Sequence, residues 1–345
     1  MNNQPHKQTT VVLLTYANRK SLLLSVLDNL ISMNISRAIV VDNGASWPII
    51  KELYELYGDS VDVLSMESNQ GTAVGYAKGI RRAIELGAEY IWLLDDDNKP
   101  NDDALALLYS VYKKNEDTCK VDGSLLLACA SYRREQYGVI NTTRELFRIR
   151  PRRNSICNFH FLDIYSRITA NLYISHKNIS ANDVIELSSA PYGGLFFHKN
   201  LIEFIGLPNS DYIIYTDDIE FTWRIYAHGG KILMPIAAEI HDLDKNWRSV
   251  GHKKKLLWSW LMQGSNFRAY YAMRNITYFD YYYRSSNKFI FKINLFLFKF
   301  LLLFCSIRYN SKERYKILIS AMNDGLAGRL GLNNLFPLPK FVIKN

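Results

Sequence analysis

Two groups of carboxylates are the residues in this sequence best suited to chemistry. The first acidic cluster, Asp95, Asp96 and Asp97, directly follows the apolar run Ile91–Leu94, which has the composition of a buried strand. Three adjacent carboxylates repel one another, and a divalent cation would relieve that repulsion. Mg²⁺ and Mn²⁺ prefer oxygen ligands, commonly one or two carboxylates together with substrate phosphates. The cluster therefore predicts a metal that carries a phosphorylated ligand, with an acidic turn that caps the next helix as the alternative.

The second acidic cluster, Asp217, Asp218 and Glu220, directly follows Thr216. Threonine is a favourable helix N-cap, so this spacing predicts that all three carboxylates lie in the first turn of a helix. A carboxylate fixed at a helix N-terminus beside a cleft is well placed to act as a general base. Carboxylates in a first turn also complement the helix dipole, which is the alternative explanation for the cluster.

The elements that must position these residues alternate between short apolar runs and helical periodicity. The apolar runs of the first hundred residues are Val11–Leu14, Ala38–Val41, Val61–Met66 and Tyr90–Leu94. Alternation at this spacing predicts parallel strands joined by helices, with both faces of the sheet covered. Ligands bind at the carboxyl ends of such strands. We therefore expect the polar residues that follow the runs to converge on one edge, namely Thr15, Asp42, Asn69 and the first acidic cluster.

Several polar and small residues near the predicted strand ends have two explanations each. Asp42 is suited to accept hydrogen bonds from a base or ribose, and equally to close an Asx-turn. Gly71 and Gly75 lie at a predicted helix start, where they would admit a phosphate or sugar or simply allow tight packing. His241 follows the predicted strand Lys231–Ile240, a position at which a histidine is commonly an ordinary surface or packed residue.

Composition and charge limit the classes of protein that fit. The chain has 345 residues, of which 48% are hydrophobic, enough for one large domain or two. Its net charge of +9 suits an anionic partner, but no recognised nucleic-acid-binding module accompanies the charge, so nucleic acid is not expected. Arginines between Ser131 and Asp183 predict an acceptor-side insertion or a solvated surface. Scattered cysteines and a polar N-terminus predict a cytosolic setting.

The C-terminal third contains one strongly apolar segment, Phe289–Cys305. Lys292 and Lys299 interrupt it, which argues against a membrane-spanning helix because a span needs about 20 mostly uncharged residues. The pattern predicts an interfacial helix whose lysines reach the lipid headgroups. The alternative is a helix that packs on the rest of the protein or on a second subunit. A homo-oligomer is therefore also compatible with the sequence.

The order of these motifs resembles that of the family 2 glycosyltransferases, which are inverting enzymes that use nucleotide-sugars. The matching segments are Leu13–Tyr16, Val41–Gly44, Asn69–Gly71, Asp95–Asp97, Tyr192–Gly194, Thr216–Glu220 with Arg224 and Gly229, and His241. The resemblance implies a GT-A fold over residues 1–245, which is a Rossmann-like α/β architecture with a mostly parallel central sheet and flanking helices. It leaves residues 246–345 as a C-terminal helical region, which is also the expected membrane-associating part.

The resemblance also implies a role for each site residue. Asp218 would be the base that deprotonates the acceptor hydroxyl, and the other members of the second acidic cluster would position the acceptor. Asp97, helped by Asp96 and His241, would bind Mn²⁺ or Mg²⁺. The residues that would hold the nucleotide-sugar are Thr15, Asp42, Asn69, Gly71 and Asp95.

The resemblance implies a metal-dependent inverting glycosyltransferase. The expected donor is a UDP-linked sugar, and the expected acceptor is a glycan or lipid-linked glycan. Within the family the motifs look most like those of bacterial galactofuranosyltransferases, which act in cell-surface polysaccharide synthesis, and next like rhamnosyltransferases that use dTDP-rhamnose. A non-catalytic nucleotide-sugar-binding scaffold of the same fold is the alternative from another class. The expected location is cytoplasmic, peripheral on the inner face of the bacterial cell membrane.

Overall fold

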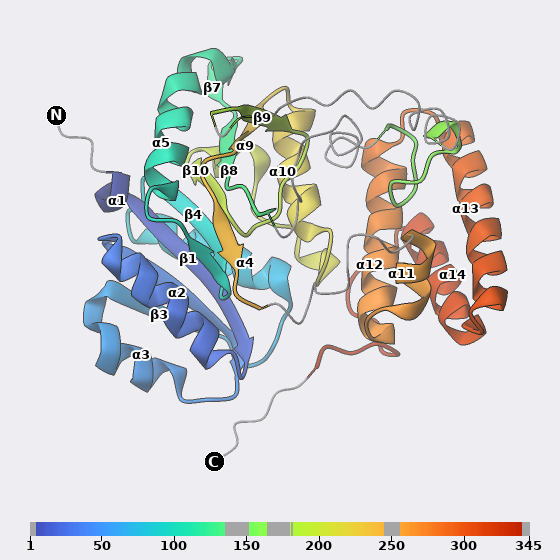
Figure 1. Ribbon diagram of the computed structural model, residues 1–345, viewed down its shortest axis with the longest axis horizontal. Helices are drawn as coiled ribbons and strands as arrows, with labels where there is room; N and C mark the ends of the chain where they lie inside the picture. The colour runs from blue at the N-terminus through green and yellow to red at the C-terminus, as the bar shows by residue number, and fades with distance from the viewer. Residues whose placement is uncertain (1–4, 135–151, 164–179, 181, 245–255, 340–345) are drawn as a thin grey trace.

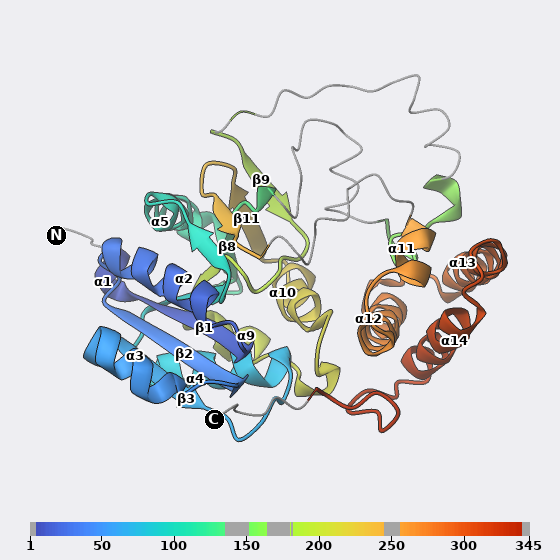
Figure 2. The same ribbon diagram turned by 60° about the horizontal axis from the view of Figure 1, so that its bottom comes forward.

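The structure of the chain is a computed structural model that describes residues 5–134, 152–163, 180, 182–244 and 256–339. An α/β part built on a central sheet lies beside a group of C-terminal helices (Figure 1). Helix α10 (Asp217–Ala227) lies on the side of the α/β part that faces the C-terminal helices, as both Figure 1 and Figure 2 show. The second acidic cluster therefore lies near the junction between the two parts.

The central sheet has eight strands among the described residues. In spatial order they are β3 (Val61–Ser65), β2 (Arg37–Ala45), β1 (Thr9–Ala17), β4 (Tyr90–Asp95), β10 (Leu195–His198), β8 (Leu127–Ala130), β11 (Lys231–Pro235) and β9 (Val184–Leu187). Strands β3, β2, β1 and β4 are mutually parallel, and β11 is parallel to β8. Strand β10 runs antiparallel between β4 and β8, and β9 is an antiparallel edge strand.

The apolar runs form buried strands because their successive side chains enter different cores on the two faces of the sheet. In β1, Val11 and Leu13 pack in one core, whereas Val12 and Leu14 pack in the other. The first core is closed by α2 (Lys20–Ser32), α3 (Ile49–Tyr57) and α5 (Ala104–Asn115). The second is closed by α4 (Thr72–Glu85), α9 (Leu201–Ile205) and α10. Both faces of the sheet are covered, as the sequence predicts.

Short elements complete the α/β part. They are α1 (Pro5–Gln8), the 3-10 turns Gly58–Ser60, Glu116–Cys119 and Ser210–Tyr212, the hairpin of β6 (Lys120–Val121) with β7 (Ser124–Leu125), and the antiparallel pair β5 (Asn98–Pro100) and β12 (Ile240–Asp242). The predicted strand Lys231–Ile240 is therefore two strands in two sheets. Pro235 ends the first of them, since proline cannot donate to a strand ladder.

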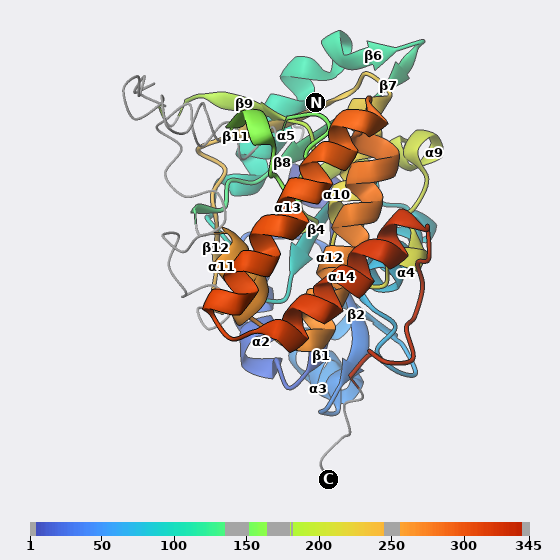
Figure 3. The ribbon, with the colours of Figure 1, turned by 90° about the vertical axis from the view of Figure 1, so that its right-hand side faces the viewer.

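The C-terminal helices form a third core. They are α11 (Leu256–Met262), α12 (Asn266–Phe279) with a π-helical extension Asp280–Arg284, α13 (Lys288–Arg308) and α14 (Lys312–Leu326). Helix α14 lies against α12 and α13, and α11 lies against α13 (Figure 3). Ile156, Phe159 and Ile213, which precede these helices in the chain, also belong to this core.

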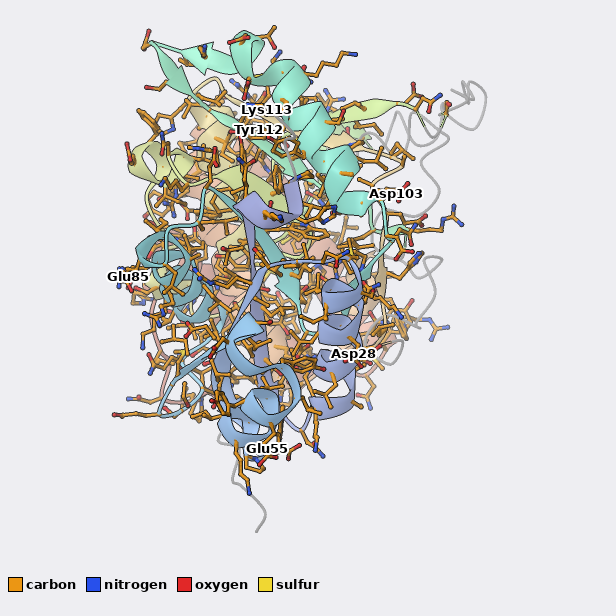
Figure 4. All side chains as sticks on the ribbon, turned by 90° about the vertical axis from the view of Figure 1, so that its left-hand side faces the viewer. Asp28, Glu55, Glu85, Asp103, Tyr112 and Lys113 are labelled. Carbon is orange, nitrogen blue, oxygen red and sulfur yellow. The ribbon has the colours of Figure 1, made fainter. Side chains whose placement is uncertain are left out.

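Helix α13 has a packed face and an exposed face. Phe291, Leu295 and Phe298 on the packed face are buried in the third core, whereas the exposed large side chains are Phe289, Phe296, Phe300, Leu303, Phe304 and Ile307. Among the described residues it is the one helix long and apolar enough to cross a membrane, judged by length and composition alone. By contrast, helices α2, α3 and α4 present charged side chains such as Asp28, Glu55 and Glu85 to the outside (Figure 4).

Candidate active site

The carboxyl ends of the parallel strands bring the predicted donor-side residues to one edge. Thr15 on β1 is in register with Asp42 on β2, and Leu14 on β1 is in register with Asp95 on β4. Asn69 follows β3, and the Asn43 side chain at the end of β2 accepts a hydrogen bond from the neighbouring Gln70 N–H at 2.8 Å. The predicted convergence on one sheet edge is confirmed, because neighbouring parallel strands end together.

Asp96 is the buried member of the first acidic cluster. Thr15 Oγ1 donates to its Oδ2 at 2.6 Å, and Arg19 Nε donates to its Oδ1 at 2.8 Å. Burial raises the pKa of Asp96 to about 7, although the Arg19 charge opposes the shift. Because both of its oxygens accept bonds from the protein, Asp96 ties the ends of β1 and β4 together, and this geometry argues against its predicted role as a metal ligand.

Asp95 is the exposed member of the first acidic cluster, with 40% of its side chain accessible. Tyr76 Oη donates to its Oδ1 at 2.8 Å. Arg133 Nη1 lies 3.4 Å from its Oδ2, and Arg133 Nη2 donates to Asp242 Oδ1 at 2.6 Å. Asp95 therefore faces solvent while two side chains fix its orientation, as a ligand-binding carboxylate requires.

Asp97 lies beside two other carboxylates. Burial and the negative charges of Asp95 and Asp242 raise its pKa to about 6, against the opposing charges of Arg19 and Arg133. A cation would relieve this excess of negative charge. The donor set is made of carboxylate oxygens, which suits Mg²⁺ or Mn²⁺ in an open site completed by substrate phosphates.

His241 lies on β12 opposite Lys99, and its Nε2 is 3.1 Å from Asn101 Oδ1. Side chains alternate along a strand, so His241 and Asp242 point to opposite faces. Asp242 is the one that binds Arg133, which also contacts Asp95. Across the described ranges, no three His, Cys, Asp or Glu side chains gather as a metal-binding group. The predicted three-ligand set of Asp96, Asp97 and His241 is thus not assembled in this structure.

Asp42 forms an Asx-turn, which is the alternative role predicted for it from the sequence. The N–H groups of Gly44 and Ala45 donate to its Oδ1 at 3.1 and 2.7 Å, and Ser65 Oγ donates to its Oδ2 at 2.9 Å. Asn69 acts similarly, because its Oδ1 accepts from the Gly71 N–H at 3.0 Å. These bonds shape the loops after β2 and β3, and the nucleotide contacts of both residues stay predictions.

The two glycines at the start of α4 serve close packing. A Cβ on Gly75 would lie 2.4 Å from Leu14 Cδ1, so the absence of a side chain lets α4 approach β1. Gly71 has a φ of +89°, and a Cβ there would lie 2.1 Å from the Ile213 carbonyl oxygen. Gly71 therefore accommodates the backbone of a distant segment, the one that leads into α10, while its predicted role toward a donor stays a prediction.

The second acidic cluster lies in the first turn of α10, as predicted, but its capping differs from the expectation. Thr216 occupies the N-cap position in a left-handed conformation with φ +67°, and its side chain makes no capping bond. Asp217 is buried, and its Oδ2 accepts from Thr72 Oγ1 at 2.8 Å. Asp218 is partly exposed, and its Oδ1 accepts from the Ile219 N–H at 2.8 Å.

Glu220, the third member, is bound to Arg224 one turn along the helix. Arg224 Nε and Nη2 donate to its two carboxylate oxygens at 2.8 and 2.6 Å, and Glu220 is buried. Arg224 Nη1 also donates to the carbonyls of Ile205 and Leu207 at the end of α9. Glu220 therefore holds α10 against α9, and this geometry argues against its predicted contact with an acceptor.

The two acidic clusters act on each other electrostatically. Burial raises the pKa of Asp218, and the nearby charge of Asp95 raises it further, while Arg133 opposes the shift. Gly193 lies beside the first cluster, because a Cβ on it would be 2.2 Å from Asn98 Oδ1 and 2.6 Å from both Arg133 Nη1 and Asp95 Oδ2. A partly exposed carboxylate with a raised pKa is suited to accept a proton near neutral pH.

Sequence reasoning missed three charged residues of this edge: Arg19, Arg133 and Asp242. Arg133 fell within the arginine-rich stretch that was predicted to be an insertion or a solvated surface, and most of that stretch lies outside the described residues. Arg133 itself is buried and bonded to Asp242. Its place three residues after β8, at the same sheet edge as the other site residues, was the one available signal.

An α/β sheet with two facing groups of carboxylates near its carboxyl edge fits the class of nucleotide-sugar enzymes. Residues 10–161 match the family model described as glycosyl transferase family 2. The match covers less than half of the chain, so this segment is similar to that family. The predicted α/β architecture, with a mostly parallel central sheet and C-terminal helices, is confirmed. The matched segment contains the first acidic cluster, whereas the second lies beyond it.

A curated relative with a stated activity is the galactofuranosyltransferase GlfT1 of Mycolicibacterium smegmatis. It is 24% identical over 236 residues, which cover 65% of this chain and 67% of the relative. The similar solved structures include GalNAc-T7 with UDP, GalNAc and Mn²⁺ (TM-score 0.47, 11% identity, 68% of this chain) and S. aureus TarS 1–349 with UDP-GlcNAc (TM-score 0.45, 14% identity, 84% of this chain). The alignments span 43% of the GalNAc-T7 chain and 71% of the TarS chain. At these TM-scores neither structure guides the assignment of site residues.

Proposed function

We propose that the protein is a metal-dependent inverting glycosyltransferase that moves a sugar from a nucleotide-sugar to a glycan acceptor. The observation that carries this proposal is the partly exposed Asp218, which lies within electrostatic reach of Asp95 in a chain whose residues 10–161 match the family 2 glycosyl transferase model. The site thus combines an accessible carboxylate of raised pKa with the predicted donor edge. A base and a donor on facing elements are what direct displacement at a sugar carbon requires.

Asp218 is the base in this proposal. Its carboxylate takes the proton of the acceptor hydroxyl as that oxygen attacks the anomeric carbon, and the bond from that carbon to the diphosphate breaks. Attack opposite the leaving group inverts the configuration, and no sugar is bound covalently to the protein. The buried neighbour Asp217, fixed by Thr72 of α4, keeps the first turn of α10 beside the donor edge.

Asp97 is the proposed metal ligand, with Asp95 on the nucleotide or ribose side. Bound Mn²⁺ or Mg²⁺ would neutralise the negative charge that develops on the diphosphate leaving group. The bonds of Asp96 to Thr15 and Arg19 support a positioning role for Asp96. The Nε2 atom of His241 contacts Asn101 Oδ1, and the predicted role of His241 as a metal ligand stays a prediction.

The donor we propose is a UDP-linked sugar, with galactofuranose as the transferred group, and similarity to a galactofuranosyltransferase supports this choice. A dTDP-rhamnose donor is the alternative. The acceptor we propose is a lipid-linked glycan of bacterial surface polysaccharide synthesis. The exposed apolar face of α13 and its basic residues Lys288, Lys292, Lys299 and Arg308, with no acidic residue on that helix, support peripheral contact with an anionic membrane surface.

The proposed organisation is a catalytic domain over residues 1–245 and a helical region over residues 246–345. The separate core of the C-terminal helices supports this division. Ile156, Cys157, Phe159 and Ile213 also belong to that core, so we propose that the two regions act as one catalytic unit.

The experiment that tests the function is a transfer assay on the purified protein with a panel of UDP-, dTDP- and GDP-sugars, with Mn²⁺ present. Thermal shift reports which donor binds, because a ligand of the native state raises the unfolding temperature. Acceptor-dependent release of the nucleoside diphosphate reports transfer. Donor binding without any release, with a range of lipid-linked acceptors, would favour the non-catalytic scaffold.

A further inference from the structure

The segment that leads into α10 has an unusual backbone. Ile213, Tyr215 and Thr216 have φ values of +66°, +67° and +67°. Residues with side chains rarely adopt this left-handed region, least of all β-branched and aromatic ones. Such a conformation persists only where surrounding contacts impose it. The next residues along the chain are Asp217 and Asp218, so whatever holds this strained segment, 213–216, also sets the position of the proposed base.

One side chain of the C-terminal helices contacts several carbonyl oxygens in and next to this segment. Asn275 on α12 is fully buried, and its Nδ2 lies 2.8, 2.8 and 2.9 Å from the carbonyl oxygens of Tyr212, Ile214 and Tyr215. One amide NH₂ group therefore contacts three carbonyl oxygens, which the backbone of this segment directs toward α12. Arg274 Nε donates to Asn275 Oδ1 at 2.9 Å, which fixes the orientation of the amide so that its NH₂ faces the segment.

The opposite side of the strained segment rests on the donor edge. The Ile213 carbonyl packs where Gly71 has no side chain, and Thr72 Oγ1 donates to Asp217 Oδ2 at 2.8 Å. The segment is thus enclosed between the start of α4 and the buried amide of Asn275. Its two restraints come from residues about 200 positions apart in the chain, one from each part of the fold.

We propose that Asn275 is a positioning residue for the transfer reaction, which holds the strained segment so that Asp218 faces the donor edge. This inference rests on the proposed role of Asp218 as the base. It assigns the C-terminal helices a function in catalysis that is distinct from any contact with a membrane. Loss of these contacts would let the segment relax toward ordinary backbone angles and would displace Asp218.

The test compares Asn275→Asp with Asn294→Asp. Aspartate has the shape of asparagine but presents an oxygen where the Nδ2 donor was, so in Asn275→Asp it faces three carbonyls. Asn294 is an equally buried asparagine of the same helical region, on α13, and its Nδ2 donates to Asn154 O at 2.8 Å, away from both acidic clusters. Asn275→Ser, a smaller change that keeps one hydroxyl donor, serves if the aspartate variant does not fold.

We expect Asn275→Asp to lower kcat by about 10- to 100-fold while the Kd of the nucleotide-sugar changes less than about twofold, since a small misplacement of a catalytic group is costly. Asn275→Ser should lie between this variant and the native protein. Amide hydrogen exchange over residues 212–219 should be faster in both Asn275 variants and unchanged in Asn294→Asp. Asn294→Asp, compared at a similar loss in Tm, should keep kcat within about twofold of the native value.

An unchanged kcat and unchanged exchange in the Asn275 variants would overturn the proposal, and so would an equal loss of kcat in Asn294→Asp. If the native protein transfers no sugar, the proposed function fails, and the exchange measurement still decides whether Asn275 holds the segment.

Discussion

The two acidic clusters differ in how the fold uses their carboxylates. The first cluster lies in the loop after a central parallel strand, and two of its three members, Asp95 and Asp97, retain some exposure. The second lies in a helix turn, and only Asp218 is partly exposed, since Asp217 and Glu220 are buried and bonded to neighbours. The contrast matches the two tasks proposed, because a metal and a diphosphate need several oxygens whereas proton abstraction needs one.

In the same comparison, burial separates the carboxylates that we propose to act on ligands from those that hold elements together. Asp96 accepts hydrogen bonds from Thr15 and Arg19, and Glu220 accepts them from Arg224. In both residues the carboxylate oxygens therefore hold two elements together. Counting carboxylates in the sequence therefore overstates the number that can touch a ligand. The following experiments test this division, in order of decreasing expected effect.

Removal of divalent metal should affect the first cluster most. With a chelator present we expect transfer to fall by about 1,000-fold or more, since nothing else would neutralise the leaving diphosphate as effectively. Asp97→Asn should raise the Mn²⁺ concentration that gives half-maximal activity, whereas Glu220→Gln should leave it unchanged. Titration of metal-free protein with Mn²⁺ measures both. Full activity in chelator would remove the metal role from the first cluster.

Gly193→Ala should disturb the first acidic cluster at Asp95. The added Cβ would lie 2.6 Å from Arg133 Nη1 and from Asp95 Oδ2, so these side chains must shift. We expect kcat/KM to fall by about 10- to 100-fold. Gly79→Ala is the matched control, because its Cβ would crowd Val12 and Val41 in the core at 2.5 and 2.9 Å and should lower stability without a comparable loss of kcat. Equal effects on kcat would contradict a role in the reaction for the Asp95 side chain beside Gly193.

The pH dependence of kcat/KM should report the raised pKa of Asp218. A protonated carboxyl cannot accept the acceptor proton, so the rate should fall about tenfold per pH unit below that pKa, which lies above the ordinary aspartate value of about 4. The charge of Asp95 contributes to the shift. Asp95→Asn should therefore move this acid limb to lower pH, measured at saturating metal. If the acid limb of the kcat/KM profile lies at the same pH in Asp95→Asn, the two carboxylates do not interact.

Glu220→Gln should have the smallest effect on activity. It weakens the paired bonds with Arg224, so we expect the free energy of unfolding to decrease by about 1–3 kcal/mol. The change in kcat should be less than about threefold, because Arg224 still binds the end of α9. Denaturant unfolding and steady-state kinetics measure the two quantities. A loss of kcat above 100-fold at unchanged donor affinity would instead support the predicted contact of Glu220 with the acceptor.

The sheet and the edge that carries the candidate site could be predicted from the sequence for a clear physical reason. Parallel strands buried on both faces are continuous apolar runs, and the polar residue that follows each run must lie at the carboxyl edge. Thr15, Asp42 and Asp95 were located in this way, and the strand registers agree. The pairing of Glu220 with Arg224 was also within reach, since residues four apart share a helix face.

The remaining features depend on contacts between distant segments. Arg133 and Asp242 are 109 positions apart, and no local pattern links them. Local preference also failed at Thr216, which has the residue type of an N-cap but takes a left-handed backbone. The bonds from Asn275 to the neighbouring carbonyls accompany this departure, and they come from a helix about 60 positions further along the chain.

The central claim, that Asp218 alone among the carboxylates of the second cluster performs the chemistry, is tested most directly by Asp218→Asn. The variant keeps the shape of the side chain and removes its capacity to take a proton. The single measurement is the transfer rate at saturating donor and metal, with donor affinity determined on the same protein. The account predicts a rate lower by about 1,000-fold with donor affinity within about twofold of native. A rate within tenfold of native, or loss of donor binding together with activity, would contradict it.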